Sequence, residues 1–455
     1  MDSSGIDLFG SLYGTAPMKR IFSVAETLRG MIAFEVALAR AQAQLGIIPQ
    51  SAADTIERTA NVESLDLATI ITGTENVGFP VIALTKELAR LAGAEAGAYI
   101  HFGATTQDAM DTSLTLALRD AFRELLRDLD GTIAGLAHLA RKHRDDVMAG
   151  RTLMQQALPV TFGYTCALWL SPLLEHRSRL VDIAARLEIV QFGGAVGTLA
   201  SLGDRGRNVG EALARELKLR MPDAPWHTDR TLLVEASSFV ALLCGSLAKI
   251  ATDVILLGQT EVGEVAEPYV AGRGASSTMP QKRNPVASGY ILGATRAVHA
   301  LASTMFATLA VEHERSPSTQ QTERIVLPQL FSLASGALAH ARAIAEGLTV
   351  DTARMRHNLD LSRGLIMAEA LTMALSKQLG KAEAHHIVTA ACNEVLAAER
   401  DLLDIVCANP DVARTYGRKE LADMLEPANY LGDCNGIIDR ILSVAKSTTL
   451  TLTVD

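Results

Sequence analysis

The sequence has 455 residues, of which 48% are hydrophobic and only 4% are aromatic, and its formal net charge is -9. A chain of this length can bury more than one core, and its negative charge without a lysine- or arginine-rich run argues against nucleic acid and membrane surfaces as partners. Its five cysteines are scattered without metal-ligand spacing, which indicates reduced thiols in a cytoplasmic protein and no metal site.

Helical periodicity dominates the chain, and no strand alternation competes with it. The longest stretches with few helix breakers are 28–45, 113–143, 162–189, 232–258, 285–309 and 328–348. Helices of this length are typical of a long-helix bundle. We therefore predict an all-α fold of three helical domains: an N-terminal domain over residues 1–100, a central long-helix bundle over 101–350 that carries the motifs, and a C-terminal domain over 351–455.

The most apolar window, residues 232–257, is long enough to raise the question of a membrane span. It contains Glu235, Lys249 and Asp253. Charged residues are rare within spanning helices because a charge in the hydrocarbon core is costly. The sequence therefore predicts a buried core helix here.

A polar segment with loosened backbone separates two of the predicted helices. It covers residues 272–285 and reads GRGASSTMPQKRNP, in which the glycines free the chain and the prolines stop a helix. An arbitrary segment of this composition would be a solvated surface loop. The whole string, however, closely resembles the G-S-S-x-M-P-x-K-x-N-P signature of the fumarase/aspartase superfamily, with Ala275 in the place of a glycine.

This resemblance implies a catalytic lid and a type of chemistry. Enzymes of the superfamily add or remove a proton at a carbon beside a carboxylate, through an aci-carboxylate carbanion. Ser276 matches the loop serine that carries this proton, and Lys282 and Asn284 match residues that stabilise the developing charge. A serine hydroxyl is a poor base by itself, so the chemistry requires a closed site with fixed positive charge.

A second motif precedes a predicted helix. Segment 101–112, HFGATTQDAMDT, is similar to the superfamily motif H-x-G-x-T-S-x-D-x-x-D-T. The resemblance implies that His101, Thr105 and Thr106 contact a substrate carboxylate. The N-terminus of a helix suits an anion, although the segment alone could be a plain capping turn, for which Thr106 and Asp108 are good caps.

A third motif, GRTLMQQALPVT at residues 150–161, resembles G-R-T-x-x-Q-x-A-x-P-x-T. The resemblance implies that Thr152 and Gln155 contact the substrate and that Gln156, where a second histidine is common, orients it. Leu153 stands where fumarases and many related lyases carry a histidine. Neither leucine nor glutamine donates a proton near neutral pH, so the reaction is not expected to need a strong acid at this point.

The nearest resemblance within the superfamily is to bacterial 3-carboxy-cis,cis-muconate cycloisomerases. They share the run QFGGAVGTL at 191–199 and the type of segment MKRIFS at 18–23. This likeness implies that Lys19 and Ser23 contact the substrate, whereas a lysine there is otherwise a solvated surface charge. The run NLDLSRGLI at 358–366 is similar to the C-terminal domain of adenylosuccinate lyase.

Two arginines complete the predicted site. Arg315 lies in the segment EHERS, and Arg324 lies in ERIVLP, which resembles the E-R-x-x-L-P of adenylosuccinate lyases. Each arginine can hold a carboxylate through a forked contact, or can pair with Glu312 or Glu323 on a helix face.

Together these resemblances imply an addition or elimination enzyme for a small polycarboxylate, most like the muconate cycloisomerases of aromatic compound catabolism. In cycloisomerisation a substrate carboxylate attacks its own double bond, so no leaving group needs a proton. Two alternatives stay open: a fumarate-releasing C–N lyase on an N-substituted aspartate, as in adenylosuccinate lyase, and a non-catalytic structural member of the superfamily. The resemblance further implies a cytoplasmic homotetramer with shared active sites and no cofactor.

Overall fold

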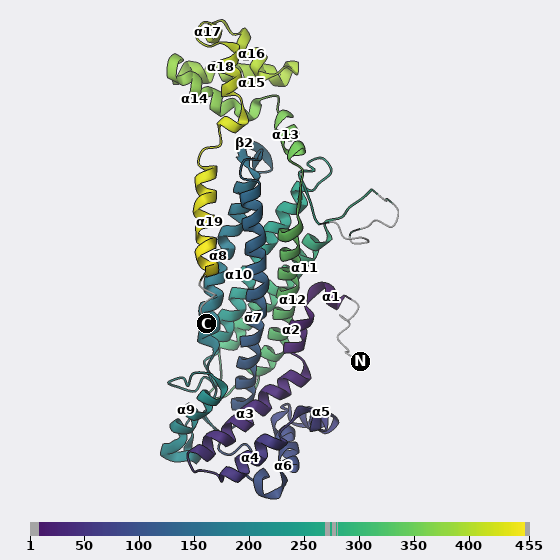
Figure 1. Cartoon of the computed structure of the whole chain (residues 1–455), viewed down its shortest axis with the longest axis vertical. Coiled ribbons are helices and arrows are strands. Elements are labelled where there is room, and N and C mark those ends of the chain that lie inside the picture. The colour runs from purple at the N-terminus through teal and green to yellow at the C-terminus, as the bar shows by residue number, and fades with distance from the viewer. Residues whose placement is uncertain (1–8, 269–273, 275–278, 280, 451–455) are drawn as a thin grey trace. The chain divides into compact units, whose positions relative to one another are not determined.

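The structure is a computed structural model that describes residues 9–268, 274, 279 and 281–450 (Figure 1). The chain forms two compact units, each assembled from three separate segments. Unit 1 consists of Met1–Leu129, His176–Gly245 and Tyr290–Ala339, and unit 2 consists of Asp130–Glu175, Ser246–Gly289 and His340–Asp455. The division into three consecutive domains stays a prediction.

The described residues are predominantly helical, which confirms the predicted all-α class. The N-terminal helices of unit 1 are α1 (Gly10–Tyr13), α2 (Ala16–Ile21), α3 (Val24–Gln44), α4 (Gln50–Thr59), α5 (Leu67–Val77) and α6 (Val81–Gly97), and α9 (Gly206–Leu217) also belongs to unit 1. Long helices that contribute residues to both units are α7 (Thr106–Lys142), α8 (Phe162–Leu187), α10 (Thr231–Leu257), α11 (Val286–Met305) and α12 (Thr319–Gly347).

Unit 2 contains the remaining helices and the short strands. Its helices are α13 (Thr352–Asp360), α14 (Ala368–Leu379), α15 (Lys381–Ala398), α16 (Leu402–Ala408), α17 (Pro410–Ala413), α18 (Arg418–Met424) and α19 (Cys434–Leu450). Strands β1 (Val147–Thr152) and β2 (Gln155–Thr161) form an antiparallel hairpin, and β3 (Val265–Ala266) pairs with β4 (Thr349–Val350).

The long helices lie near the predicted stretches, but two of them start earlier. Helix α7 starts at Thr106, seven residues before the predicted stretch 113–143. The larger difference is at α12. The sequence predicts that this helix starts at Pro328, but it starts at Thr319 and Pro328 lies inside it. Ser316 Oγ accepts the N–H of Thr319 at 3.2 Å and so caps the first turn. A proline inside a helix removes one hydrogen bond. Here Leu327 and Phe331, on either side of it, are fully buried and keep the helix packed.

The hairpin is an element that the sequence analysis did not predict. Its strands pair so that Thr152 lies opposite Gln155, and the turn between them consists of Leu153 and Met154. A two-residue hairpin is normally signalled by Asn-Gly or Asp-Gly. The Leu-Met pair carries no such signal, so the sequence predicts only a break between two helices here.

Each unit has its own hydrophobic core. In unit 1, α3, α6 and α9 contribute Phe34, Leu84 and Leu213, all fully buried in one cluster. In unit 2, α14 and α16 contribute Leu375 and Leu402 to a separate cluster under the C-terminal helices. Each cluster removes apolar side chains from water and thereby stabilises the helices around it.

Helix α10 is long and apolar enough to cross a bilayer by length and composition alone. In unit 1, however, its Phe239 and Leu243 are buried in the protein, and its Glu235 forms an ion pair with Arg186. In unit 2, its Asp253 accepts a hydrogen bond from Trp169 Nε1 at 2.6 Å. These contacts are those of a core helix, as the charged residues in its sequence predict.

A buried ionic cluster joins three segments of unit 1. Arg230, which is fully buried at the start of α10, donates to Asp111 on α7 at 2.8 and 3.0 Å and to Glu323 on α12 at 2.7 and 2.6 Å. Burial raises the pKa of Glu323. Burial alone would also raise the pKa of Asp111, but Arg230 outweighs it and the pKa lies below its ordinary value.

We predict that Arg230→Met lowers the free energy of unfolding by roughly 3 to 5 kcal/mol, because it leaves two buried carboxylates without their cation. Urea unfolding followed by circular dichroism measures the loss. The matched control is Arg186→Met, which removes an arginine that is 48% exposed from its pair with Glu235 in the same unit. That variant is expected to lose about 1 kcal/mol or less. Equal losses in both variants would contradict the importance of the cluster.

Candidate active site

The N-terminal end of α7 is organised by the carboxylate of Asp108, which is fully buried. Its Oδ2 accepts the backbone N–H groups of Thr105 and Gly194, each at 3.0 Å. Its Oδ1 accepts the N–H of Gly193 at 3.0 Å and lies 2.7 Å from His227 Nε2. One carboxylate thus fixes the turn before α7 and a glycine-rich loop that lies far away in the sequence.

The predicted substrate residues Thr105 and Thr106 lie at this helix end. Thr106 is the first residue of α7, and both threonines are half-buried. The backbone N–H of Thr105 donates to the carboxylate of Asp108. The capping turn, which the sequence analysis left open as an alternative, is therefore present. A cap does not exclude ligand binding, because a helix N-terminus has several N–H groups and a positive dipole end.

The glycine-rich loop in turn fixes Arg315. Gly194 has a φ of 68°, a left-handed conformation that glycine adopts without strain. The carbonyl oxygens of Gly194 and Ala195 accept hydrogen bonds from Arg315 Nη2 at 3.4 and 2.9 Å. Arg315 Nε is buried and has no acceptor among the described residues. The guanidinium is therefore held in place by the loop, which fixes a positive charge beside it.

His101, also predicted to contact substrate, precedes α7 in a left-handed conformation with a φ of 62°. Its Nδ1 lies 2.6 Å from Oε1 of Glu35, a buried residue of α3. Burial alone would lower the pKa of His101, but the pair with Glu35 and the nearby charge of Asp108 raise it. A half-buried imidazole with a raised pKa thus lies a few residues from Thr105.

Arg324 is held by backbone and ring contacts. Its Nη1 donates to the carbonyl oxygen of Gly78 at 3.0 Å, and its guanidinium lies over the ring of Phe79 at 5.0 Å. Burial lowers the pKa of Arg324. Glu323, its proposed helix-face partner, is bound by Arg230 instead. Arg324 also lines a pocket of about 320 Å³ in unit 1. Its role as a ligand contact stays a prediction.

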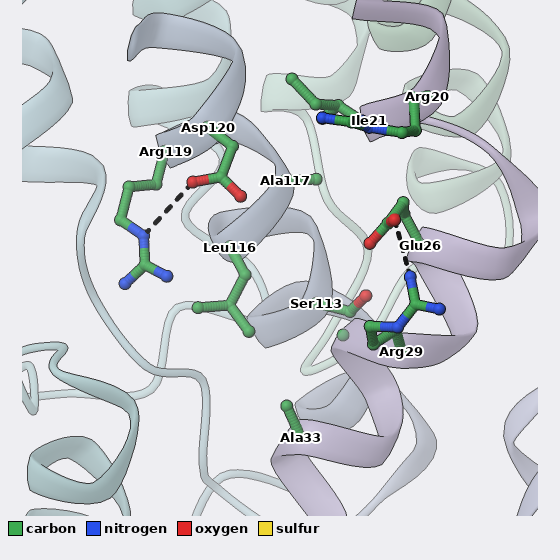
Figure 2. A pocket seen from close by; sticks show the side chains of 11 residues that line it. Arg20, Ile21, Glu26, Arg29, Ala33, Ser113, Leu116, Ala117, Arg119 and Asp120 are labelled. Carbon is green, nitrogen blue, oxygen red and sulfur yellow. Dashed lines mark ion pairs between the residues drawn. The ribbon is translucent and has the colours of Figure 1, made fainter. Parts of the chain in front are cut away.

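Of the two predicted residues near the N-terminus, Ser23 has a structural contact. Ser23 caps α3, since its Oγ accepts the N–H of Glu26 at 3.3 Å. Lys19 lies in the last turn of α2. Figure 2 shows a neighbouring pocket of about 350 Å³, lined by Arg20, Arg29 and other residues of α2, α3 and α7. Its carboxylates form ion pairs with its own arginines, and neither Lys19 nor Ser23 lines it.

In unit 2 the hairpin presents Thr152 and Gln155 at its end. The two residues between them, Leu153 and Met154, have φ values of 51° and 66°, as in a type I′ turn. Their exposed fractions are 96% and 71%, and Thr152 and Gln155 are exposed as well. The hairpin end therefore exposes two polar side chains and two apolar turn residues. Neither turn side chain carries an acidic hydrogen.

The end of the hairpin beside the turn is anchored by Glu264, which is fully buried. Arg151 of the motif forms a forked ion pair with Glu264 at 2.9 and 2.7 Å, and Asn358 Nδ2 donates to the same carboxylate at 2.7 Å. Gln156 Nε2 donates to the carbonyl oxygen of Asn358 at 2.9 Å. These contacts give Gln156 an anchoring role, and its contact with substrate stays a prediction.

The described part of the signature loop shows how Asn284 and Lys282 are placed. Asn284 donates both its backbone N–H and its side-chain Nδ2 to the carbonyl oxygen of Gly274, each at 3.1 Å. Lys282 is exposed, and its backbone N–H donates to Met279 at 3.1 Å. The predicted proton carrier Ser276 lies outside the described residues.

A glutamate supports the helix that follows this loop. Glu267 accepts the backbone N–H groups of Ala287 and Ser288 at 3.0 and 2.7 Å, and also the hydroxyl of Ser288 at 2.7 Å. It thereby caps α11 from outside the helix. Glu267, like Glu35, Glu264 and His227, was missed by sequence reasoning because its partner is distant in the chain.

Two family models match the chain. The family described as "Lyase" matches residues 13–299, and the one described as "Adenylosuccinate lyase C-terminus" matches residues 364–441. The first match covers more than half of the chain and includes all three motif segments. The class of protein is thereby defined as an all-α enzyme of the lyase type.

Similar proteins extend over nearly the whole chain. A 3-carboxy-cis,cis-muconate cycloisomerase of Bradyrhizobium diazoefficiens is 45% identical, with 96% of this chain and 97% of the relative covered. A nitrosuccinate lyase of Streptomyces davaonensis is 41% identical, with 93% and 92% covered. The crystal structure of a 3-carboxy-cis,cis-muconate lactonizing enzyme from Pseudomonas putida matches with a TM-score of 0.93 and 43% identity, over 97% of this chain and 100% of that one. The chain belongs to the fumarase/aspartase superfamily.

We predict that Met154→Gly raises the free energy of unfolding by about 1 kcal/mol, because glycine removes the strain of a left-handed side-chain residue at an exposed turn. The matched control is Thr152→Gly in the adjoining extended strand, which is expected to lose about 0.5 to 1 kcal/mol. Urea unfolding measures both. A loss of stability in Met154→Gly as large as the control's would show that the turn is not strained.

Proposed function

We propose that the protein is a cycloisomerase that converts 3-carboxy-cis,cis-muconate, or a closely related polycarboxylate, into a lactone during aromatic compound catabolism. The observation that carries this proposal is Leu153, which places an apolar side chain between the two proposed hairpin contacts, Thr152 and Gln155. A reaction that expels a poor leaving group needs an acid near the substrate. Cycloisomerisation expels none, and a relative named for this reaction is 45% identical.

The proposed steps balance without a cofactor. One substrate carboxylate oxygen attacks the substrate's own double bond, a C–O bond forms, and the π electrons move toward a neighbouring carboxylate as an aci-carboxylate. Lys282 and Asn284 stabilise this charge, and the hydroxyl of Ser276 then delivers a proton to carbon. The remaining carboxylates are bound by Thr105 and Thr106 at the start of α7, by Arg315 and by His101. Further contacts are proposed for Lys19, Ser23, Gln156 and Arg324.

We further propose a cytoplasmic homotetramer with shared active sites, built from three helical domains. The support comes from exposure: Thr152, Gln155 and Lys282 are all exposed in unit 2. Catalysis of this kind requires water to be excluded from the developing carbanion. Groups that are exposed in one chain can meet that requirement when another copy covers them.

A second candidate is an elimination with a leaving group that needs no acid. The same absence of a proton donor on Leu153 permits it, and a nitrosuccinate lyase is 41% identical to this chain. Cleavage of adenylosuccinate fits less well, because its departing amine benefits from an acid.

The test that separates these candidates is a pH–rate profile on different substrates. We expect the wild type to consume 3-carboxy-cis,cis-muconate, followed by ultraviolet absorbance, and Leu153→His to gain nothing on it. Met154→His is the matched control, because it adds the same imidazole to the adjacent exposed turn position. A wild type inert toward the muconate, with Leu153→His alone gaining adenylosuccinate cleavage below neutral pH, would overturn the proposal in favour of a C–N lyase.

Active sites shared between subunits lead to a separate prediction. Thr106→Ala and Ser276→Ala should each lower turnover, the latter by roughly a hundredfold, because they remove a substrate contact and the proton carrier. When the two inactive variants are unfolded, mixed and reassembled, partial activity should return, since some sites then combine intact motifs from different chains. Light scattering that shows an active monomer, or mixtures that never regain activity, would contradict this prediction.

A further inference from the structure

Glu35 is a buried carboxylate with an incomplete set of partners. It lies on α3 with only 1% of its side chain exposed. Its Oε1 is 2.6 Å from His101 Nδ1, and its Oε2 is buried without a partner among the described residues. A buried carboxylate is costly unless it is paired and hydrogen-bonded. Packing alone would be served better by an apolar residue, so the charge of Glu35 needs a reason.

The pair leaves one nitrogen of His101 for another partner. Because Glu35 accepts at Nδ1, the remaining nitrogen is Nε2. The side chain of His101 is 20% exposed, and among the described residues its ring has a hydrogen-bond partner at Nδ1 alone. Nε2 is thus left for a ligand on a partly exposed ring, within a few residues of Thr105 and Thr106 at the start of α7.

The loop that carries His101 is held by two side chains of α3. Gln42, two turns after Glu35, donates its Nε2 to the carbonyl oxygen of Phe102 at 2.7 Å. His101 itself has a left-handed φ of 62°, an uncommon conformation for this residue. The imidazole is thus fixed both by its own ring nitrogen and by the backbone beside it.

The charges that act on His101 come from two helices. Glu35 faces it from α3, and Asp108 contributes from α7, where its carboxylate is also bound to His227. Burial alone would lower the pKa of His101, but the two carboxylates outweigh burial and raise it. The cationic form of the ring is therefore favoured.

We propose that Glu35 is a positioning residue, which holds His101 protonated and directs its Nε2–H toward a carboxylate of the substrate at the start of α7. This inference rests on the proposed function, because it adds a residue to the carboxylate-binding part of that site. Glu35 does not touch the substrate. It acts through His101, and its buried charge offsets the desolvation of the imidazolium.

The Glu35–His101 pair determines how the binding of a carboxylate ligand should change with pH. A carboxylate ligand binds better to the imidazolium than to neutral imidazole. Removing the charge of Glu35 lowers the pKa of His101, so the ring loses its proton at a lower pH. Binding should then weaken at pH values between the old and the new pKa, and should be unchanged at a pH where both forms are protonated.

The test uses Glu35→Gln, which keeps the shape and a hydrogen-bond acceptor but removes the charge. The His101 ring is titrated by NMR with labelled histidine, its signal being assigned through His101→Asn. In the wild type the midpoint is expected above the ordinary value of about 6.5, and in Glu35→Gln it should fall. Binding of tricarballylate, a saturated tricarboxylate, should weaken roughly tenfold at pH 7.5 and little at pH 5.5. Glu35→Asp, which retains the charge, should recover part of both effects.

Gln42→Met is the matched control, because it breaks the other anchor of the same loop without changing charge. It should lower the melting temperature and leave the His101 midpoint in place. An unchanged midpoint in Glu35→Gln, an equal shift in Gln42→Met, a wild-type midpoint below the ordinary value, or no tricarballylate binding would each overturn the inference. Neither measurement requires turnover, so a failure of the proposed reaction would be seen separately.

Discussion

The carboxylate of Asp108 is the interaction on which the candidate site depends. It accepts hydrogen bonds from the backbone of Thr105, Gly193 and Gly194 and binds His227, all at 3.0 Å or less. Hydrogen bonds to an ionised acceptor are roughly twice as strong as neutral ones. This carboxylate therefore replaces the packing that a loop of small residues cannot supply.

The carboxylate of Asp108 also determines where positive charge lies in the candidate site. The glycine-rich loop that Asp108 holds offers two carbonyl oxygens to Arg315, and the turn that it caps carries the two threonines of the motif. Positive charge and helix N–H groups are thus fixed before any ligand arrives. Fixed donors favour catalysis because they need no reorganisation when charge develops on the substrate.

The same device recurs in unit 2. Glu264 anchors the hairpin through Arg151 and Asn358, and Glu267 caps α11 after the signature loop. In each place a buried or half-buried carboxylate anchors residues near a proposed substrate contact. Asp108, Glu264 and Glu267 therefore have structural roles.

The sequence predicts the fold class well and the site in part. Long apolar periodicity identifies the helices because their burial pattern repeats locally, whereas the hairpin escapes because a Leu-Met turn carries no glycine signal. His101, Thr105 and Thr106 follow from a contiguous motif. The partners Glu35, His227 and Arg230 do not, since pairing across tens to hundreds of residues leaves no local pattern. Leu153 is informative because it departs from a motif that otherwise matches.

The central claim is that this member of the superfamily forms a ring within its substrate and expels nothing. The most direct measurement incubates the wild-type protein with 3-carboxy-cis,cis-muconate in D₂O and identifies the product by NMR. We predict a lactone that carries one deuterium on the carbon beside a carboxylate, because the proton on the loop hydroxyl exchanges with solvent. An unchanged muconate, together with release of fumarate from an N-substituted aspartate or nitrosuccinate, would contradict the account.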